Sequence, residues 1–208
     1  MRPGLAQLEA LVGIPVLGVV PWMDLDIDDE DSVSSRLEAR HTNKPIDVAV
    51  IHLPRISNFT DFTALDQHPA LGLRYVSNRE QLAQPDLLII PGTKNTMEDL
   101  LWLRQNGLET AIKKLAASGA PILGICGGYQ MLGRTIADPD GVEAGGEMRG
   151  LDLLPTVTTF TTQKTRSRVS GRVNGLDGFF SHLSGAKFVG YEIHVGQTEC
   201  MESVDGRS

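Results

Sequence analysis

Apolar runs typical of strands alternate with helical segments between residues 46 and 136, and short glycine turns join them. Four runs are rich in Val, Ile and Leu: 46–53, 71–77, 86–92 and 121–128. Helical spacing follows the third and fourth runs, at 96–107, 108–119 and from 129 onward. This alternation predicts an α/β fold in which helices cover both faces of an open, mostly parallel sheet.

The best-defined helix is expected at 96–107, where it would bury Met97, Leu100, Leu101 and Leu103. Thr96 is a candidate N-cap and Gly107 a candidate stop.

The last third of the chain is different, because β-rich segments separated by glycines replace the alternation of strands and helices. They predict a β-rich C-terminal extension, either antiparallel or added at the sheet edge, from 150–162, 167–173 and 186–196.

The N-terminal segment has its own pattern. Residues 3–12 have helical spacing and 14–20 are typical of a short buried strand. Six acids follow within 24–32, which favours a solvated loop, and the chain stays polar to about residue 43. We place a domain boundary there.

Composition excludes several classes of protein. The net charge of −7 opposes a nucleic-acid partner, and no apolar run approaches the ~20 residues that span a bilayer. Two cysteines in 208 residues form no disulfide framework, which indicates a reducing, cytoplasmic setting. No Cys/His cluster has zinc spacing, so no metal site is expected.

The junction at 121–133 carries the strongest chemical signal, because a strand runs into a helix with Cys126 between Gly124, Gly127 and Gly128. A nucleophile elbow needs this arrangement, since side chains two before or just after the nucleophile would clash in so tight a turn. The turn would lift the sulfur to the carboxyl end of the sheet, where α/β folds bind ligands. A buried structural cysteine is the plainer alternative. The other cysteine, Cys200, lies near a polar terminus.

A thiolate needs a proton partner, and His194 is the best candidate among five histidines because it ends an apolar strand beside glycine. His52 also ends a strand but suits a core or surface role. The remaining three lie in polar loops: His41, His68 and His182.

A second glycine turn, at 90–96, follows the third strand and should lie beside Cys126. The N–H groups of Gly92 and Gly127 are therefore candidates for the two donors of an oxyanion hole. The turn lacks the phosphate-loop pattern.

These motifs resemble class I, triad-type glutamine amidotransferase domains and, more narrowly, the cobyric acid synthase family. Four segments carry the resemblance, in order: PGTKNTMEDLLWLRQNGL (91–108), GICGGYQMLG (124–133), EMRGLDLLP (147–155) and GYEIHVGQT (190–198). The resemblance implies a flavodoxin-like fold. It also implies that 1–43 are the remnant of an upstream ATP-dependent synthetase domain with an acidic linker, 44–200 the glutaminase domain and 201–208 a polar tail.

The resemblance further implies a reaction. Cys126 would attack the side-chain amide of glutamine, Gly92 and Gly127 would hold the oxyanion, and His194 would transfer protons. Gln130 and Thr93 are expected to bind substrate. The ammonia would amidate carboxylates of a corrin ring, converting adenosylcobyrinic acid a,c-diamide to cobyric acid. ATP and magnesium would bind the synthetase domain, and this domain would hold no cofactor.

Two departures from the class are visible. The wider class has a glutamate two residues after the histidine, where this chain has Gly196, a gap shared with the cobyric acid synthase branch. Glu192 could orient His194 instead, but strand alternation places it two residues back on the same face, which disfavours it. The family domain also continues with a further glycine-rich strand and an HG turn, whereas the printed sequence ends at Ser208.

Several alternatives stay open. The acceptor could be a cell-wall lipid precursor or the substrate of cobyrinic acid a,c-diamide synthase. The chain could also be a catalytically silent fragment, or a cysteine peptidase or deglycase of similar fold. Expected partners are glutamine and, through a synthetase domain, a corrinoid acceptor, with a homodimer as an open alternative and with neither nucleic acid nor membrane.

Overall fold

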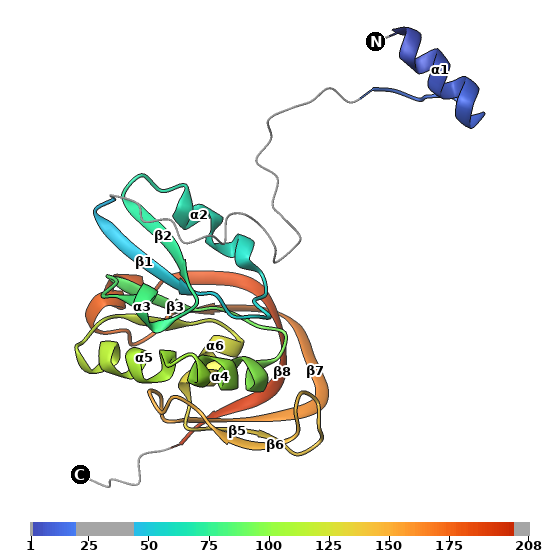
Figure 1. The fold of residues 1–208 in the computed structure, drawn as a ribbon. Helices are drawn as coiled ribbons and strands as arrows, with labels where there is room; N and C mark the ends of the chain where they lie inside the picture. Colours follow the sequence, from blue (N-terminus) through green and yellow to red (C-terminus); the bar gives the residue numbers. More distant parts are fainter. Residues whose placement is uncertain (1, 20–43, 202–208) are drawn as a thin grey trace, which may run out of the picture.

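The structure is a computed structural model that describes residues 2–19 and 44–201. Figure 1 shows the elements in chain order. The helices are α1 (Arg2–Val12), α2 (Thr63–Asp66), α3 (Arg79–Leu82), α4 (Thr96–Gln105), α5 (Leu108–Ala117) and α6 (Gly127–Leu132), with 3-10 turns η2 (Phe59–Phe62) and η3 (Gly178–Leu183). The strands are β1 (Ile46–Ile51), β2 (Leu71–Val76), β3 (Leu87–Ile90), β4 (Ile122–Gly124), β5 (Thr135–Asp138), β6 (Gly146–Arg149), β7 (Thr156–Arg172) and β8 (Lys187–Cys200).

The first four strands form a parallel sheet in the order β2-β1-β3-β4. This order matches the start of the flavodoxin-type arrangement, so the predicted α/β class is confirmed. Parallel strands are covered on both faces and therefore read as continuous apolar runs, as Val48–Ile51 and Leu88–Ile90 do with almost no exposed surface. The carboxyl ends of β3 and β4 consequently lie side by side, and the turns that follow them meet there.

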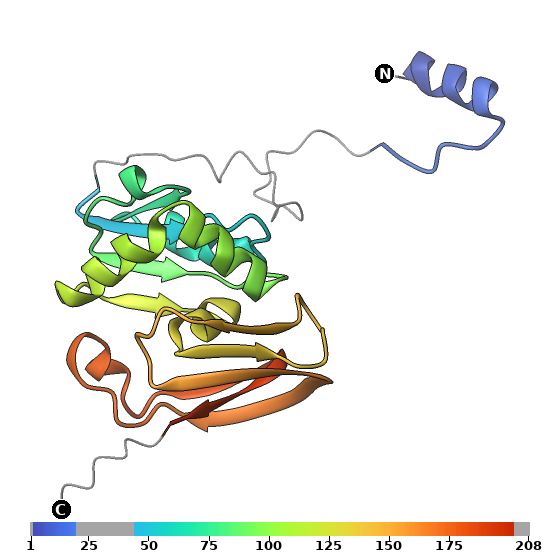
Figure 2. The same cartoon turned by 60° about the horizontal axis from the view of Figure 1, so that its bottom comes forward.

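Helices α4 and α5 follow β3 and lie against the first sheet (Figure 2). Their buried apolar residues belong to the hydrophobic core. Two details of the prediction for α4 were wrong. Leu101 is 45% exposed, whereas Asp99 is fully buried. The N-cap is Asn95, whose side chain accepts a hydrogen bond from the Glu98 N–H, and not Thr96. Gly107 does end the pattern, with φ of 70° in the turn before α5.

The last third forms a second sheet in the order β6-β5-β7-β8, as the predicted β-rich extension requires. Strands β7 and β8 pair antiparallel over most of their length, with an irregularity between Thr159 and Lys164. A single strand, β7, replaces the two expected at 150–162 and 167–173, and the short strands β5 and β6 were not predicted. Helix α6 contacts both β4 and β7, so it joins the two sheets.

The N-terminal residues agree with the sequence prediction only in part. The helix predicted at 3–12 is present as α1. The buried strand predicted at 14–20 is wrong for residues 14–19, which have no regular structure and expose Leu17 to 98%. A buried strand requires a neighbouring strand and a covering layer, and within the described residues this segment has neither. The acidic segment 24–32, the boundary near 43 and tail residues 202–208 lie outside the described residues.

Candidate active site

Cys126 occupies a strained turn between β4 and α6. Its backbone has φ of 50° and ψ of −110°, a region that residues with a side chain rarely adopt. Such strain persists only where the surrounding structure enforces it, and it is concentrated at functional sites. The side chain is exposed. The alternative of a buried structural cysteine therefore does not fit.

The flanking glycines are required by close backbone approach. A Cβ at Gly128 would lie 2.0 Å from the carbonyl oxygen of Ile90, because α6 begins directly against the end of β3. A Cβ at Gly124 would lie 2.6 Å from the side chain of Leu132 and 2.8 Å from the Gly128 carbonyl. The predicted clash on both sides of the nucleophile is confirmed.

The turn after β3 lies beside the thiol, as predicted. A Cβ at Gly92 would come within 3.7 Å of the Cys126 Cβ. Within the part of the chain that the structure describes, the N–H groups of Gly92 and Gly127 make no hydrogen bond. Two free backbone donors therefore flank the thiol, which is the arrangement that an oxyanion hole requires.

Buried Asp99 anchors this turn. Its carboxylate accepts hydrogen bonds from the Thr93 hydroxyl at 2.6 Å, from the Arg55 N–H at 3.1 Å and from the Arg55 guanidinium at 3.0 Å. Thr93, a predicted substrate ligand, thus directs its hydroxyl at Asp99. Asp99 itself was missed, because an acid within an apolar helical pattern suggests an exposed position.

Gln130, the other predicted substrate ligand, is buried with both ends of its amide in use. Its Oε1 accepts from the Thr96 hydroxyl at 3.2 Å, and its Nε2 donates to the Val195 carbonyl at 3.1 Å. It therefore ties the helix after Cys126 to α4 and to the strand that carries His194.

The structure brings His194 into the same cavity as Cys126. This cavity has a volume of about 320 Å³, and its lining residues are Cys126, Tyr129, Gln130, Glu192, Ile193, His194 and Thr198. Both nitrogens of the His194 ring are already engaged: Nδ1 with the Gly196 carbonyl at 2.9 Å and Nε2 with Glu192 Oε1 at 2.7 Å. No hydrogen bond joins His194 to Cys126 among the described residues.

The contact between Glu192 and His194 is the one that strand alternation disfavoured. The two residues do share a face of β8, but both side chains are long enough for their ends to meet. The hydrogen bond from His194 lowers the pKa of Glu192 below its ordinary value, so the carboxylate is ionised at neutral pH. A glutamate two residues before the histidine was the signal available in the sequence.

Comparison with known proteins places these features in a family. Residues 47–206 match the model of the CobB/CobQ-like glutamine amidotransferase domain. The chain belongs to this family. Among curated relatives, cobyric acid synthase of Ruminiclostridium cellulolyticum is 54% identical over the whole chain, and that of Moorella thermoacetica is 51% identical. The chain spans 40% of the length of each.

A solved structure of PurLQS from Thermotoga maritima shares the fold, with a TM-score of 0.58 and 22% identity over 78% of this chain and 72% of that one. This likeness shows the α/β fold, and the family match makes the domain an enzyme domain of the glutamine amidotransferase type. Within the described residues, no helix is long and apolar enough to cross a membrane, and no three His, Cys, Asp or Glu side chains are grouped as metal ligands.

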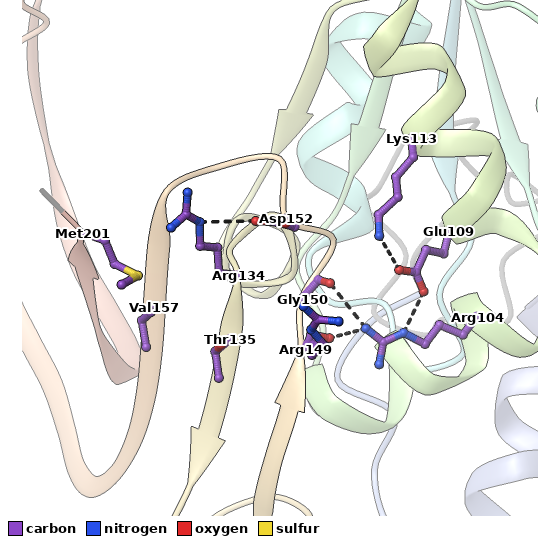
Figure 3. Close-up of a pocket in the computed structure, with 10 residues that line it drawn as sticks. All are labelled: Arg104, Glu109, Lys113, Arg134, Thr135, Arg149, Gly150, Asp152, Val157 and Met201. Atoms are coloured by element: carbon purple, nitrogen blue, oxygen red, sulfur yellow. Dashed lines mark hydrogen bonds and ion pairs between the residues drawn. The ribbon is translucent and has the colours of Figure 1, made fainter. Parts of the chain in front are cut away.

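A larger cavity of about 770 Å³ lies elsewhere in the amidotransferase domain, between α5 and the second sheet (Figure 3). Its charged groups largely pair with one another. Glu109 accepts from Arg104 and Lys113, both at 2.7 Å, and Arg134 pairs with Asp152 at 3.3 Å. Cys126 does not line it, so the smaller cavity is the candidate active site.

Proposed function

We propose that this domain hydrolyses glutamine to glutamate and ammonia through a Cys126 thiolate. The observation that carries the proposal is the exposed, strained cysteine that lines a small cavity and has two free backbone N–H groups beside it. Membership of the amidotransferase family supports it.

In the proposed reaction, the thiolate attacks the side-chain amide carbon of glutamine. The N–H groups of Gly92 and Gly127 hold the oxyanion while the carbon–nitrogen bond breaks and ammonia leaves with an added proton. Water then adds to the thioester, which releases glutamate and restores the thiol. The balance is glutamine plus water to glutamate plus ammonia.

We assign proton transfer to His194, the imidazole that lines the cavity with Cys126. In the observed arrangement its Nε2 faces Glu192. Transfer to or from the sulfur therefore requires Nε2 to exchange that contact for the thiol or the leaving group.

The ammonia has a proposed acceptor. We infer that it serves the ATP-dependent amidation of corrin-ring carboxylates, from adenosylcobyrinic acid a,c-diamide to cobyric acid. Support comes from relatives named cobyric acid synthase at 54%, 51% and 47% identity. In this proposal ATP, magnesium and the corrinoid bind a synthetase portion, which corresponds to part of the relatives' additional length.

Glutamate release from glutamine tests the first step. We expect Cys126→Ala to abolish release and His194→Ala to lower it about 10²–10⁴-fold, the usual contribution of a general acid–base. Release that survives Cys126→Ala would refute the mechanism. Full activity of His194→Ala would place the proton carrier elsewhere.

Incubation of the longer protein with ATP, magnesium, glutamine and candidate acceptors tests the second step. Amide formation on the corrinoid supports the assignment. Amidation of a cell-wall lipid precursor, or of cobyrinic acid itself, would replace it.

A further inference from the structure

The cavity beside Cys126 has an acidic side chain in its lining. Of the seven described residues that line it, Glu192 is the one acid, and none is lysine or arginine. A free amino acid carries an α-ammonium group, whose transfer out of water is costly unless an acceptor or an opposite charge receives it. Glu192 is the carboxylate in this wall that can meet that need.

Glu192 is held in place yet remains accessible. Its Oε1 accepts from His194 Nε2 at 2.7 Å, and its Oε2 accepts from the Ser167 hydroxyl on β7 at 3.3 Å. Its side chain is 43% exposed. Because each carboxylate oxygen has two acceptor sites, each retains one for another donor.

We propose that Glu192 binds the α-ammonium group of the glutamine substrate and so selects a free amino acid over an amide that lacks this group. The inference rests on the proposed glutaminase function and deepens it. His194 and Ser167 fix the carboxylate, and the cavity volume of about 320 Å³ is at the lower end of small-molecule sites, roughly 300–1,000 Å³. A substrate whose amide reaches Cys126 would then present its ammonium group to Glu192 within the same cavity.

A different role for Glu192 must be distinguished, namely orientation of His194. The two roles predict different kinetics. An orienting residue acts on the chemical step of every amide, whereas an ammonium ligand acts only on substrates that carry the ammonium. Glutaramate separates them, because it is glutamine without the α-amino group.

The test compares ammonia release from L-glutamine and glutaramate by wild type, Glu192→Gln and the control Glu199→Gln. Glu199 is an exposed acid on the same strand that does not line the cavity. We expect Glu192→Gln to lower kcat/KM for glutamine roughly 10- to 100-fold, the range for a hydrogen bond to a charged group, mainly through KM. Glutaramate turnover should respond to Glu192→Gln only through the contact with His194, so we expect it to change much less than glutamine turnover, and Glu199→Gln should match wild type on both substrates. An equal loss on both substrates, or an unchanged preference, would overturn the inference.

A binding measurement separates this inference from the proposed function. Binding is measured by titration calorimetry with Cys126→Ser, a variant chosen to bind the substrate without hydrolysing it. It should bind glutamine more tightly than glutaramate. Adding Glu192→Gln should remove the difference. That result supports the inference even if the wild type hydrolyses nothing, whereas an undiminished preference refutes it even if the wild type is an active glutaminase.

Discussion

The Gln130 amide donates a hydrogen bond to the Val195 carbonyl at 3.1 Å, and this contact links the helix that follows Cys126 to the strand that carries His194. The two catalytic candidates lie 68 positions apart in the chain: Cys126 follows β4 of the first sheet, and His194 lies on β8 of the second sheet. Their relative position therefore depends on contacts of this kind.

Gln130→Leu removes that link. The substitution removes the hydrogen bonds of Gln130 to the Thr96 hydroxyl and to the Val195 carbonyl, so we expect a loss of roughly 1–3 kcal/mol in the free energy of unfolding. Urea unfolding measures it, with Gln163→Leu on the exposed part of β7 as the control. An unchanged midpoint would show that the link does not stabilise the fold. A raised KM for glutamine with unchanged stability would instead support direct substrate binding.

Gly128→Ala tests the close approach of α6 to β3. The added methyl would lie 2.0 Å from the Ile90 carbonyl oxygen, so the backbone must shift. We expect a loss of about 3 kcal/mol or more, because overpacking against rigid backbone is at the upper end of its usual range. Gly190→Ala, where nothing lies within 4 Å, should change stability by less than about 0.5 kcal/mol. Equal effects of the two substitutions would contradict the geometry.

Asp99→Asn and Glu98→Gln form a matched pair, since both acids contact Arg55. Asp99 is buried and also holds Thr93, so we expect its neutralisation to cost about 1–3 kcal/mol. Glu98 is exposed, and its loss should cost under about 1 kcal/mol. Chemical denaturation compares the two.

Asp138 makes the free energy of unfolding depend on pH in the acidic range. Burial alone would raise the pKa of this carboxyl, but hydrogen bonds from the N–H groups of Gly145, Glu143 and Val142 together hold it below its usual value. The stabilisation is therefore fully present above the unfolded pKa of about 3.9 and is lost as pH falls through the lower folded value.

Unfolding from pH 7 to pH 2 checks this linkage. Asp138→Asn should be less stable at pH 7 and should lose less stability on acidification than wild type. Exposed Asp140→Asn, in the same turn, is the control. A parallel pH profile for wild type and Asp138→Asn would contradict the assignment.

Much of the scaffold could be predicted from local pattern. Strands β1 to β4 were visible because each lies in a segment rich in Val, Ile and Leu, and the elbow was visible because glycines at 124, 127 and 128 are unusual around a cysteine. Strands β5 and β6 were missed because their sequences, TIAD and GEMR, contain no apolar run and the strands are defined by pairing. The prediction of a buried strand at 14–20 was wrong for residues 14–19, because an apolar run alone does not show whether a neighbouring strand is present to bury it.

The sequence by itself determined the parallel sheet, through the alternation of strands and helices, and the tight turn at Cys126, through the glycines that such a turn requires. Only the tertiary structure decided that Asp99 is buried, that Gln130 ties two elements together and that Glu192 contacts His194. These outcomes depend on which side chains meet across elements distant in sequence or, for Glu192 and His194, on which rotamers the surrounding sheet permits.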